Sequence, residues 1–249
     1  MQIVVNQLLT TYQMSGSGKL ILLLHGWGDS SQGLHALQAE LAKRYQVLAL
    51  DLPGFGGTQA PPEAWGLSGY AAFVAAALQK IGVKPYAVLG HSNGGAVAIR
   101  GLASGSLTAD KLILLASAGI RNEYKARKKV VRLAAKTAKL ATKPLPKSLQ
   151  RKLKAKAYAT IGSDALVAEH LQATFERVVN DDVQADAAKL KLPTLLIYGH
   201  DDTATPVRYG ELLQAAIGHS DLHVVPDAGH FVHLDQPSTV TQLIEEFLK

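Results

Sequence analysis

The sequence predicts an α/β protein built on a mostly parallel, twisted sheet of about eight strands with helices on both faces. Short apolar runs alternate with helical patterns along the chain, which is the order that a parallel sheet requires. The later runs are leucine-rich and β-branched without polar alternation, as expected for strands buried on both faces. With 249 residues, 47% of them hydrophobic, the chain can bury a sizeable core, and a disordered chain is excluded.

The first two expected strands, Ile3–Val5 and Leu8–Met14, are separated by Asn6 and Gln7 alone, and this spacing predicts a β-hairpin. The other strands are predicted from short apolar runs bounded by polar residues, glycine or proline. They are Leu20–Leu24, Val47–Leu50, Ala87–Leu89, Leu112–Leu115, Thr194–Tyr198 and Leu222–Val225.

Helical patterns fill the gaps between these strands. Leu67 to Ile81 carries an apolar stripe at helical spacing, and Gly82 is placed to end that helix. Asn93–Leu102, Pro206–Ile217 and Pro237–Leu248 are also expected to be helical, the last two with proline at the first turn.

The alternation stops between about residues 119 and 191, where the pattern is helical and is interrupted by Pro144 and Pro146. The sequence therefore predicts two parts. Residues 1–118 and 192–249 form a core domain, and residues 119–191 form an inserted helical cap on the sheet.

Positive charge is concentrated in the expected cap. Residues 121–156 hold 14 of the 26 lysines and arginines and one of the 20 acidic residues, so the rest of the chain is acidic. A solvated surface is the favoured interpretation, and weak contact with an anionic membrane surface or an acidic substrate is the alternative. Nucleic acid is not expected as a partner, because no aromatic residues are interleaved with the charges to stack on bases.

The composition narrows the possible chemistry. The absence of cysteine excludes disulfides, thiolate metal sites and a cysteine nucleophile. The histidines and acids show no metal-ligand spacing and there is no phosphate-binding glycine loop, so neither a metal nor a cofactor is expected. No apolar run approaches the ~20 residues of a membrane span, and the chain does not start with a basic and then an apolar segment. A soluble cytoplasmic protein is therefore expected.

The segment Gly90-His91-Ser92-Asn93-Gly94-Gly95 follows an expected strand directly and opens an expected helix. In that position a G-x-S-x-G sequence forms a sharp turn that projects the serine hydroxyl, and its glycines let the backbone fold back without clashes. Ser92 is therefore a candidate nucleophile. The alternative is an ordinary glycine-rich turn of the kind found in nucleotide-binding folds.

The segment His25-Gly26-Trp27-Gly28 ends an earlier strand in a similar loop. A tight turn there can direct the backbone N–H of Trp27 at an oxyanion, beside the backbone N–H of Asn93. His25 is the alternative candidate for a catalytic base, although a histidine directly before a glycine turn is more typical of a residue that braces the loop.

Five motifs in order resemble the α/β-hydrolase superfamily over nearly the whole chain, apart from the expected cap. They are His25-Gly26-Trp27, Asp51-Leu52-Pro53-Gly54-Phe55-Gly56, Gly90 to Gly95, Tyr198-Gly199-His200-Asp201-Asp202 and Asp227-Ala228-Gly229-His230-Phe231. The resemblance implies an α/β-hydrolase fold with an inserted helical cap and a serine hydrolase activity, but it does not single out a substrate.

The resemblance also implies a catalytic triad of Ser92, Asp202 and His230, in the chain order typical of this architecture. In that triad His230 takes the proton of Ser92, and Asp202 fixes the tautomer of His230. Asp201 and His233 are the neighbouring alternatives to Asp202 and His230.

Asp51 is a further candidate acid, but in similar proteins this residue braces the turn that follows it. His219 and His223 are expected on the surface.

The expected function is that of a carboxylesterase-like serine hydrolase, which cleaves small-molecule carboxylic esters through an acyl-enzyme intermediate. Other activities of the superfamily remain alternatives: lipase, lactonase, C–C bond hydrolase, peptidase and perhydrolase. A small-molecule receptor or regulatory binding protein with little turnover is the alternative from another class. The oligomeric state stays open.

Overall fold

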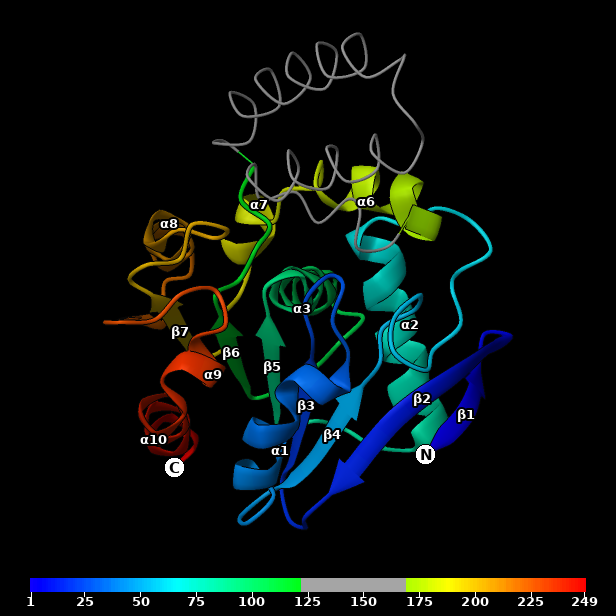
Figure 1. Cartoon of the computed structure of the whole chain (residues 1–249), viewed down its shortest axis with the longest axis horizontal. Coiled ribbons are helices and arrows are strands. Elements are labelled where there is room, and N and C mark those ends of the chain that lie inside the picture. The colour runs from blue at the N-terminus through cyan, green and yellow to red at the C-terminus, as the bar shows by residue number, and fades with distance from the viewer. Residues whose placement is uncertain (122–168) are drawn as a thin grey trace, which may run out of the picture.

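An eight-stranded sheet forms the centre of the computed structural model, which describes residues 1–121 and 169–249 (Figure 1). The strands lie in the order β1-β2-β4-β3-β5-β6-β7-β8, and pairing from β4 to β8 is parallel throughout. All eight predicted strands are present, with ends that differ by two residues at most. Their bounds are β1 Gln2–Val5, β2 Leu8–Ser15, β3 Leu20–Leu24, β4 Gln46–Leu50, β5 Ala87–His91, β6 Lys111–Leu115, β7 Thr194–Gly199 and β8 Ser220–Val225.

The predicted hairpin forms the antiparallel edge of the sheet. Asn6 and Gln7 both have positive φ, of 47° and 66°, and this conformation matches the twist of a two-residue hairpin. Strand β2 then pairs antiparallel with β4, with Tyr12 opposite Leu50. The hairpin therefore extends the parallel sheet at the side away from β5, β7 and β8, the strands that Ser92, Asp202 and His230 follow.

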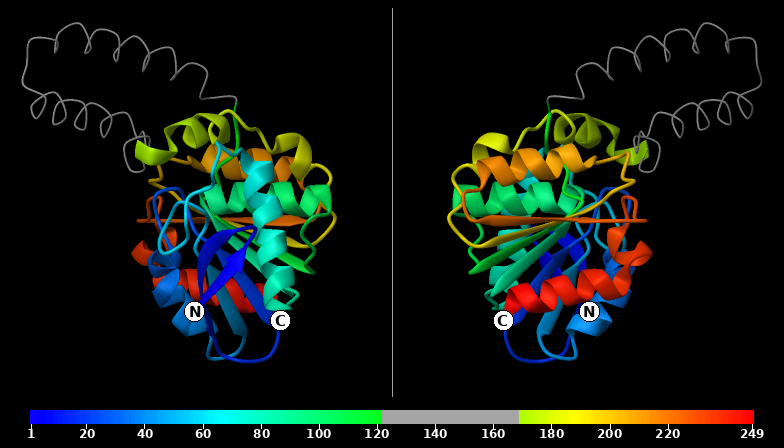
Figure 2. Two further views of the ribbon diagram at one scale, coloured as in Figure 1. Left: turned by 90° about the vertical axis from the view of Figure 1, so that its right-hand side faces the viewer. Right: turned by 90° about the vertical axis from the view of Figure 1, so that its left-hand side faces the viewer.

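Helices cover both faces of the sheet and create two separate cores (Figure 2). Successive residues of a strand point to opposite faces, so Leu22 and Leu24 join one core while Ile21 and Leu23 join the other. The first core is closed by α2 (Leu67–Ile81), α3 (Asn93–Ser104) and α8 (Val207–Ala216). The second is closed by α1 (His35–Leu41), α9 (Val232–Asp235) and α10 (Pro237–Leu248).

The four helices predicted in the core domain are all present. Helix α2 ends where expected, because Gly82 adopts a left-handed conformation with φ of 80°. The short elements were missed, namely α1, α9 and the 3-10 helix η1 (Ser31–Leu34). Each spans two turns or fewer, which is too short for helical periodicity to stand out from the surrounding loop.

Of the expected cap, the structure describes residues 119–121 and 169–191. This second stretch contains the 3-10 helix η3 (Glu169–Leu171), α6 (Gln172–Val178) and α7 (Gln184–Ala187), beyond the carboxyl ends of the parallel strands (Figure 1). The basic stretch 121–156 lies outside the described residues except for Arg121, so its interpretation stays a prediction.

The described stretch is tied to the core by polar contacts. Arg100 of α3 donates to Asp186 over 2.6 Å and to the carbonyl of Asp182, and Asp181 accepts from the backbone of Leu67 over 2.7 Å. Within residues 1–121 and 169–249, no helix has the length and apolar content needed to cross a membrane.

Candidate active site

Ser92 lies at the sharp turn between β5 and α3 and has a strained backbone, with φ of 51° and ψ of −117°. Such a conformation costs on the order of 1–3 kcal/mol for a residue other than glycine and is stable only when the surroundings enforce it. Two neighbouring glycines allow this. A Cβ atom at Gly26 would lie 3.2 Å from Ser92 Cβ, and one at Gly94 would collide with the carbonyl groups of Leu24 and His25.

Three of the predicted site residues are brought into one hydrogen-bonded chain. Ser92 Oγ lies 3.0 Å from His230 Nε2, and His230 Nδ1 lies 2.8 Å from Asp202 Oδ2. The residues come from three strand ends, since Ser92 follows β5, Asp202 follows β7 and His230 follows β8. The arrangement can pass the serine proton to a histidine whose other nitrogen is held by a carboxylate.

The Asp202 carboxylate has four donors. Oδ1 accepts from the backbone N–H groups of Ala204 (2.7 Å) and Thr205 (2.9 Å), and Oδ2 lies 2.7 Å from the Thr205 hydroxyl in addition to His230. Burial by itself raises the pKa of the Asp202 carboxyl, but the hydrogen bonds from His230 and Thr205 outweigh it and bring that pKa below its usual value. Asp202 therefore stays ionised near neutral pH.

The alternatives to Asp202 and His230 lie elsewhere. Asp201 points outward, with a side chain that is 62% exposed and bound to His200 Nδ1 over 2.8 Å. His233 is buried, and its Nε2 lies 3.2 Å from the carbonyl oxygen of Gly33, to which it donates.

His25 and Asp51 have structural partners. His25 Nε2 accepts from the backbone of Leu52 over 2.9 Å and Nδ1 donates to the Gly26 carbonyl over 2.7 Å, so both ring nitrogens are used. Burial lowers the pKa of His25, which keeps the ring neutral. Asp51 accepts from the backbone N–H groups of Ser31 and Gly57, both at 2.8 Å, and thus holds two loops together.

The two backbone N–H groups predicted for an oxyanion hole lie on adjoining loops. Asn93 is the first residue of α3, where backbone N–H groups have no partner within the helix. Trp27 follows Gly26, which contacts Ser92 closely. Among the residues that the structure describes, neither N–H group donates to a protein acceptor.

An aromatic cluster lies beside this loop. The Trp27 ring packs edge-on against Phe55, with 4.9 Å between ring centroids, and lies 5.2 Å from Phe175 of α6. The indole Nε1 is buried without a hydrogen-bond partner in the described part of the chain. Helix α6 thus supplies an apolar wall next to the loop that carries the Trp27 N–H.

Two residues of this region were not predicted to matter. His91 precedes Ser92, and its Nε2 donates to the backbone carbonyl of His230 over 2.9 Å, which links the two loops. Burial, reinforced by His230 and His233, holds the pKa of His91 well below its usual value. The other is Thr205, whose hydroxyl contacts Asp202 and His230.

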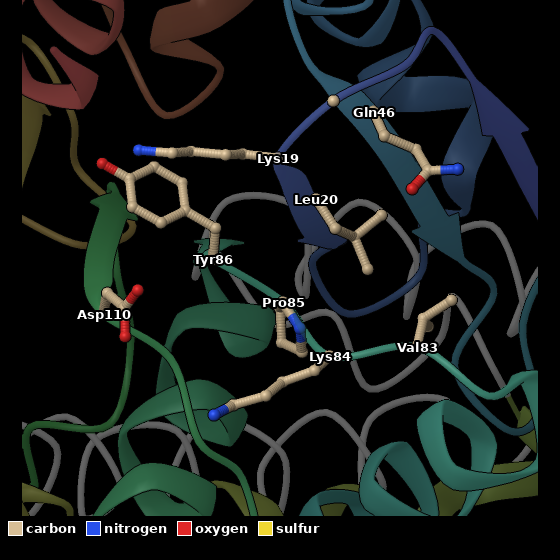
Figure 3. A pocket seen from close by; sticks show the side chains of 9 residues that line it. Lys19, Leu20, Gln46, Val83, Lys84, Pro85, Tyr86 and Asp110 are labelled. Carbon is tan, nitrogen blue, oxygen red and sulfur yellow. The ribbon is translucent and has the colours of Figure 1, made fainter.

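A separate hollow of about 420 Å³ lies at the opposite edge of the sheet, where β3 and β5 begin (Figure 3). The Lys19 amine there lies 4.3 Å from the Tyr86 ring centroid. None of its lining residues is a serine or histidine, so it cannot hold a second serine–histidine pair. In the described ranges, no group of three histidines or acids is arranged to hold a metal ion.

Comparison with known proteins agrees with this architecture. The sequence profile of the alpha/beta hydrolase family matches residues 21–243, and the chain belongs to this family. It is 28% identical over 260 residues to pimeloyl-[acyl-carrier protein] methyl ester esterase of Serratia marcescens, covering 95% of this chain and 97% of that protein.

Another relative is a hydrolase of a different compound. The chain is 25% identical to 2-hydroxy-6-oxo-2,4-heptadienoate hydrolase of Pseudomonas putida, over 94% of this chain and 90% of that protein. Among solved structures, a thermophilic esterase from Thermogutta terrifontis superposes with a TM-score of 0.76 at 23% identity, covering 100% of this chain and 97% of that chain. The predicted fold class is thereby confirmed.

Proposed function

We propose that this protein is a serine hydrolase that cleaves carboxylic esters through an acyl-enzyme intermediate. The observation that carries the proposal is the continuous chain of contacts from Ser92 Oγ to His230 (3.0 Å) and from His230 to Asp202 (2.8 Å). Membership of the alpha/beta hydrolase family and the similarity to a methyl ester esterase support it. Residues Ser92, His230 and Asp202 act as nucleophile, base and orienting acid.

In the first half of the reaction Ser92 Oγ attacks the acyl carbon while its proton moves to His230 Nε2. The carbonyl oxygen becomes an oxyanion, which accepts hydrogen bonds from the backbone N–H groups of Trp27 and Asn93. As the C–O bond to the alcohol breaks, His230 gives its proton to the departing oxygen, and the acyl group remains on Ser92.

In the second half water replaces the alcohol. His230 takes a proton from water, whose oxygen attacks the acyl carbon and regenerates the oxyanion. Collapse releases the carboxylic acid and returns the proton from His230 to Ser92 Oγ. Throughout, the ionised Asp202 keeps the proton of His230 on Nδ1 and stabilises the imidazolium that forms in each half.

The test is hydrolysis of a chromogenic ester series from acetate to long-chain acyl groups, with Ser92→Ala alongside the wild type. We expect many turnovers by the wild type and a loss of at least about 10³-fold in Ser92→Ala. Ser106→Ala, just past the other end of α3, is the matched control and should keep wild-type activity. Absence of turnover, or activity that survives in Ser92→Ala, would refute the proposal.

A C–C bond hydrolase is the second candidate, because one relative is a 2-hydroxy-6-oxo-2,4-heptadienoate hydrolase. An assay with 2-hydroxy-6-oxo-2,4-heptadienoate beside the ester series separates the two activities, because the ratio of the two kcat/KM values shows which substrate is preferred. A receptor would instead give a single slow hydrolysis followed by no further turnover.

A further inference from the structure

Thr205 lies in the loop between β7 and α8, directly before Pro206, and only 4% of its surface is exposed. Its hydroxyl oxygen has three polar neighbours. They are Asp202 Oδ2 at 2.7 Å, the backbone oxygen of Ala116 at 2.9 Å and His230 Nδ1 at 3.1 Å. The hydroxyl therefore touches both members of the Asp202–His230 pair.

A hydroxyl has one proton, and two acceptors compete for it. Asp202 Oδ2 is the nearer acceptor and carries charge, and hydrogen bonds to charged groups are the stronger ones. If the proton pointed at Ala116 instead, a hydroxyl lone pair would face the ionised Oδ2 at 2.7 Å, which is repulsive. The proton therefore goes to Asp202 Oδ2.

The same geometry affects the proton on His230 Nδ1. That nitrogen lies 2.8 Å from Asp202 Oδ2 and 3.1 Å from the Thr205 oxygen, so its proton faces two oxygens. Oδ2 in turn receives two donors, which divides its charge between His230 and Thr205. Both effects make the hydrogen bond between His230 and Asp202 weaker than it would be without the Thr205 hydroxyl.

We propose that Thr205 is a positioning residue that acts through Asp202. Its hydroxyl holds Asp202 Oδ2 in place and weakens the hydrogen bond that His230 Nδ1 donates to Oδ2. The proposal rests on the proposed function of Ser92, His230 and Asp202 as a triad.

The other groups around His230 do not compete with this contact. His91 from β5 has its ring centroid 4.9 Å from that of His230, and His233 from α9 packs on His91 at the same distance. Both rings are buried, and burial lowers the pKa of each, which keeps them neutral. Tyr198 of β7 donates to the carbonyl of Ser117 over 2.9 Å, so its hydroxyl proton is already used.

The experiment compares Thr205→Val, which removes the hydroxyl at nearly constant shape, with Thr205→Ser, which keeps the hydroxyl and removes the methyl group. The first readout is the proton resonance of His230 Nδ1–H in the protein without substrate. We expect a downfield displacement in Thr205→Val, because the bond to Oδ2 is no longer shared, and a near-wild-type position in Thr205→Ser.

The second readout is the pH profile of kcat/KM for ester hydrolysis. We expect the acidic limb of Thr205→Val to move up by roughly half a pH unit, because the undivided carboxylate stabilises imidazolium, while Thr205→Ser matches the wild type. Equal displacement in both variants, or displacement in Thr205→Ser alone, would show that Thr205 acts by packing and would overturn the proposal.

The two readouts separate this proposal from the proposed function. If the wild type hydrolyses no ester, the proposed function fails, and the resonance measured without substrate still decides whether the Thr205 hydroxyl moderates the Asp202–His230 bond. If ester turnover is robust and neither readout responds to Thr205→Val, the Thr205 proposal fails alone.

Discussion

Histidines 25, 91 and 233 are buried, and a backbone contact fixes the tautomer of each. A backbone carbonyl can only accept, so His91 and His233 carry their proton on Nε2, while His25 carries its proton on Nδ1. His230 differs, because its two nitrogens face a serine hydroxyl and a carboxylate. This difference in partners, and not the residue type, distinguishes the candidate base from its neighbours.

The hydrogen bond from His91 to the backbone of His230 can be tested by substitution. His91→Ala removes the donor to the His230 carbonyl and frees the loop that holds the base. We expect kcat/KM for ester hydrolysis to fall by about 10- to 100-fold, since small displacements of a reacting group are costly. The exposed His223 provides the control, and His223→Ala should leave kcat/KM unchanged.

Ser92 was predicted from its place in a glycine-rich turn between an expected strand and an expected helix, whereas Asp202 and His230 were predicted from the resemblance to the α/β-hydrolase superfamily. It did not predict Thr205, whose role depends on the direction of a side chain within an irregular loop. His91 lay inside a recognised motif, but its partner is a carbonyl 139 residues away, which no local pattern indicates.

Among the elements, the turn from β5 to α3 depends on glycine for space rather than for flexibility. Gly94→Ala would drive a methyl group into the backbone of the loop that follows β3. We expect a loss of about 3 kcal/mol or more in the free energy of unfolding, measured by urea denaturation. Gly218→Ala is the matched control, because a Cβ there meets nothing within 4 Å, and stability should stay within about 0.5 kcal/mol of wild type.

The ion pair that attaches α7 to α3 can also be tested by substitution. Arg100→Ala removes the 2.6 Å contact with Asp186, whose side chain is 16% exposed. We expect backbone amides of residues 184–187 to lose roughly 1–2 kcal/mol of protection in hydrogen exchange, while β5 keeps its protection. Arg208→Ala breaks an exposed pair with Glu211 and should change protection by less than about 0.5 kcal/mol. Equal effects of the two variants would contradict the assignment.

Strands were predicted correctly where burial on both faces requires apolar residues, and helices were missed where they are short. The strands from β3 to β7 are covered on both faces, so their residues are apolar except near the strand ends and stand out from the flanking loops. Helix α1 has apolar residues only at Leu37 and Leu41 of its seven, apart from alanine, and two turns do not establish a period.

At the scale of the whole molecule, the buried neutral histidines make stability depend on pH. Burial lowers the pKa of His25, His91 and His233 below 6.5, so below that pH the unfolded chain binds protons that the folded chain does not. Their contribution is fully present above pH 6.5 and is lost as the pH falls toward the lower folded values. We expect the free energy of unfolding to fall between pH 7.5 and 5.5, by at most about 1.4 kcal/mol per histidine, the limit that the unfolded pKa of 6.5 sets.

Urea denaturation across that range measures the effect. His233→Gln keeps a donor for the Gly33 carbonyl but cannot titrate, so its free energy of unfolding should depend less steeply on pH than that of the wild type. A steeper or identical dependence would show that His233 does not bind an additional proton on unfolding.

The overall architecture follows from the sequence more completely than the site does. The alternation of apolar runs and helical patterns predicted a parallel sheet covered on both faces. It also predicted about eight strands, and the described residues form eight, because each buried strand is visible as an apolar run. The division into a core and a cap over 119–191 stays a prediction, since residues 122–168 lie outside the described part.

The wide separation of the site residues along the chain has a kinetic consequence. Ser92 and His230 are 138 residues apart and meet only after the sheet from β5 to β8 has closed, and such long-range pairings form late. During refolding, the reactivity of Ser92 toward an active-site label should therefore return after the far-ultraviolet circular dichroism signal, which makes nucleophilic reactivity a reporter of the final assembly step.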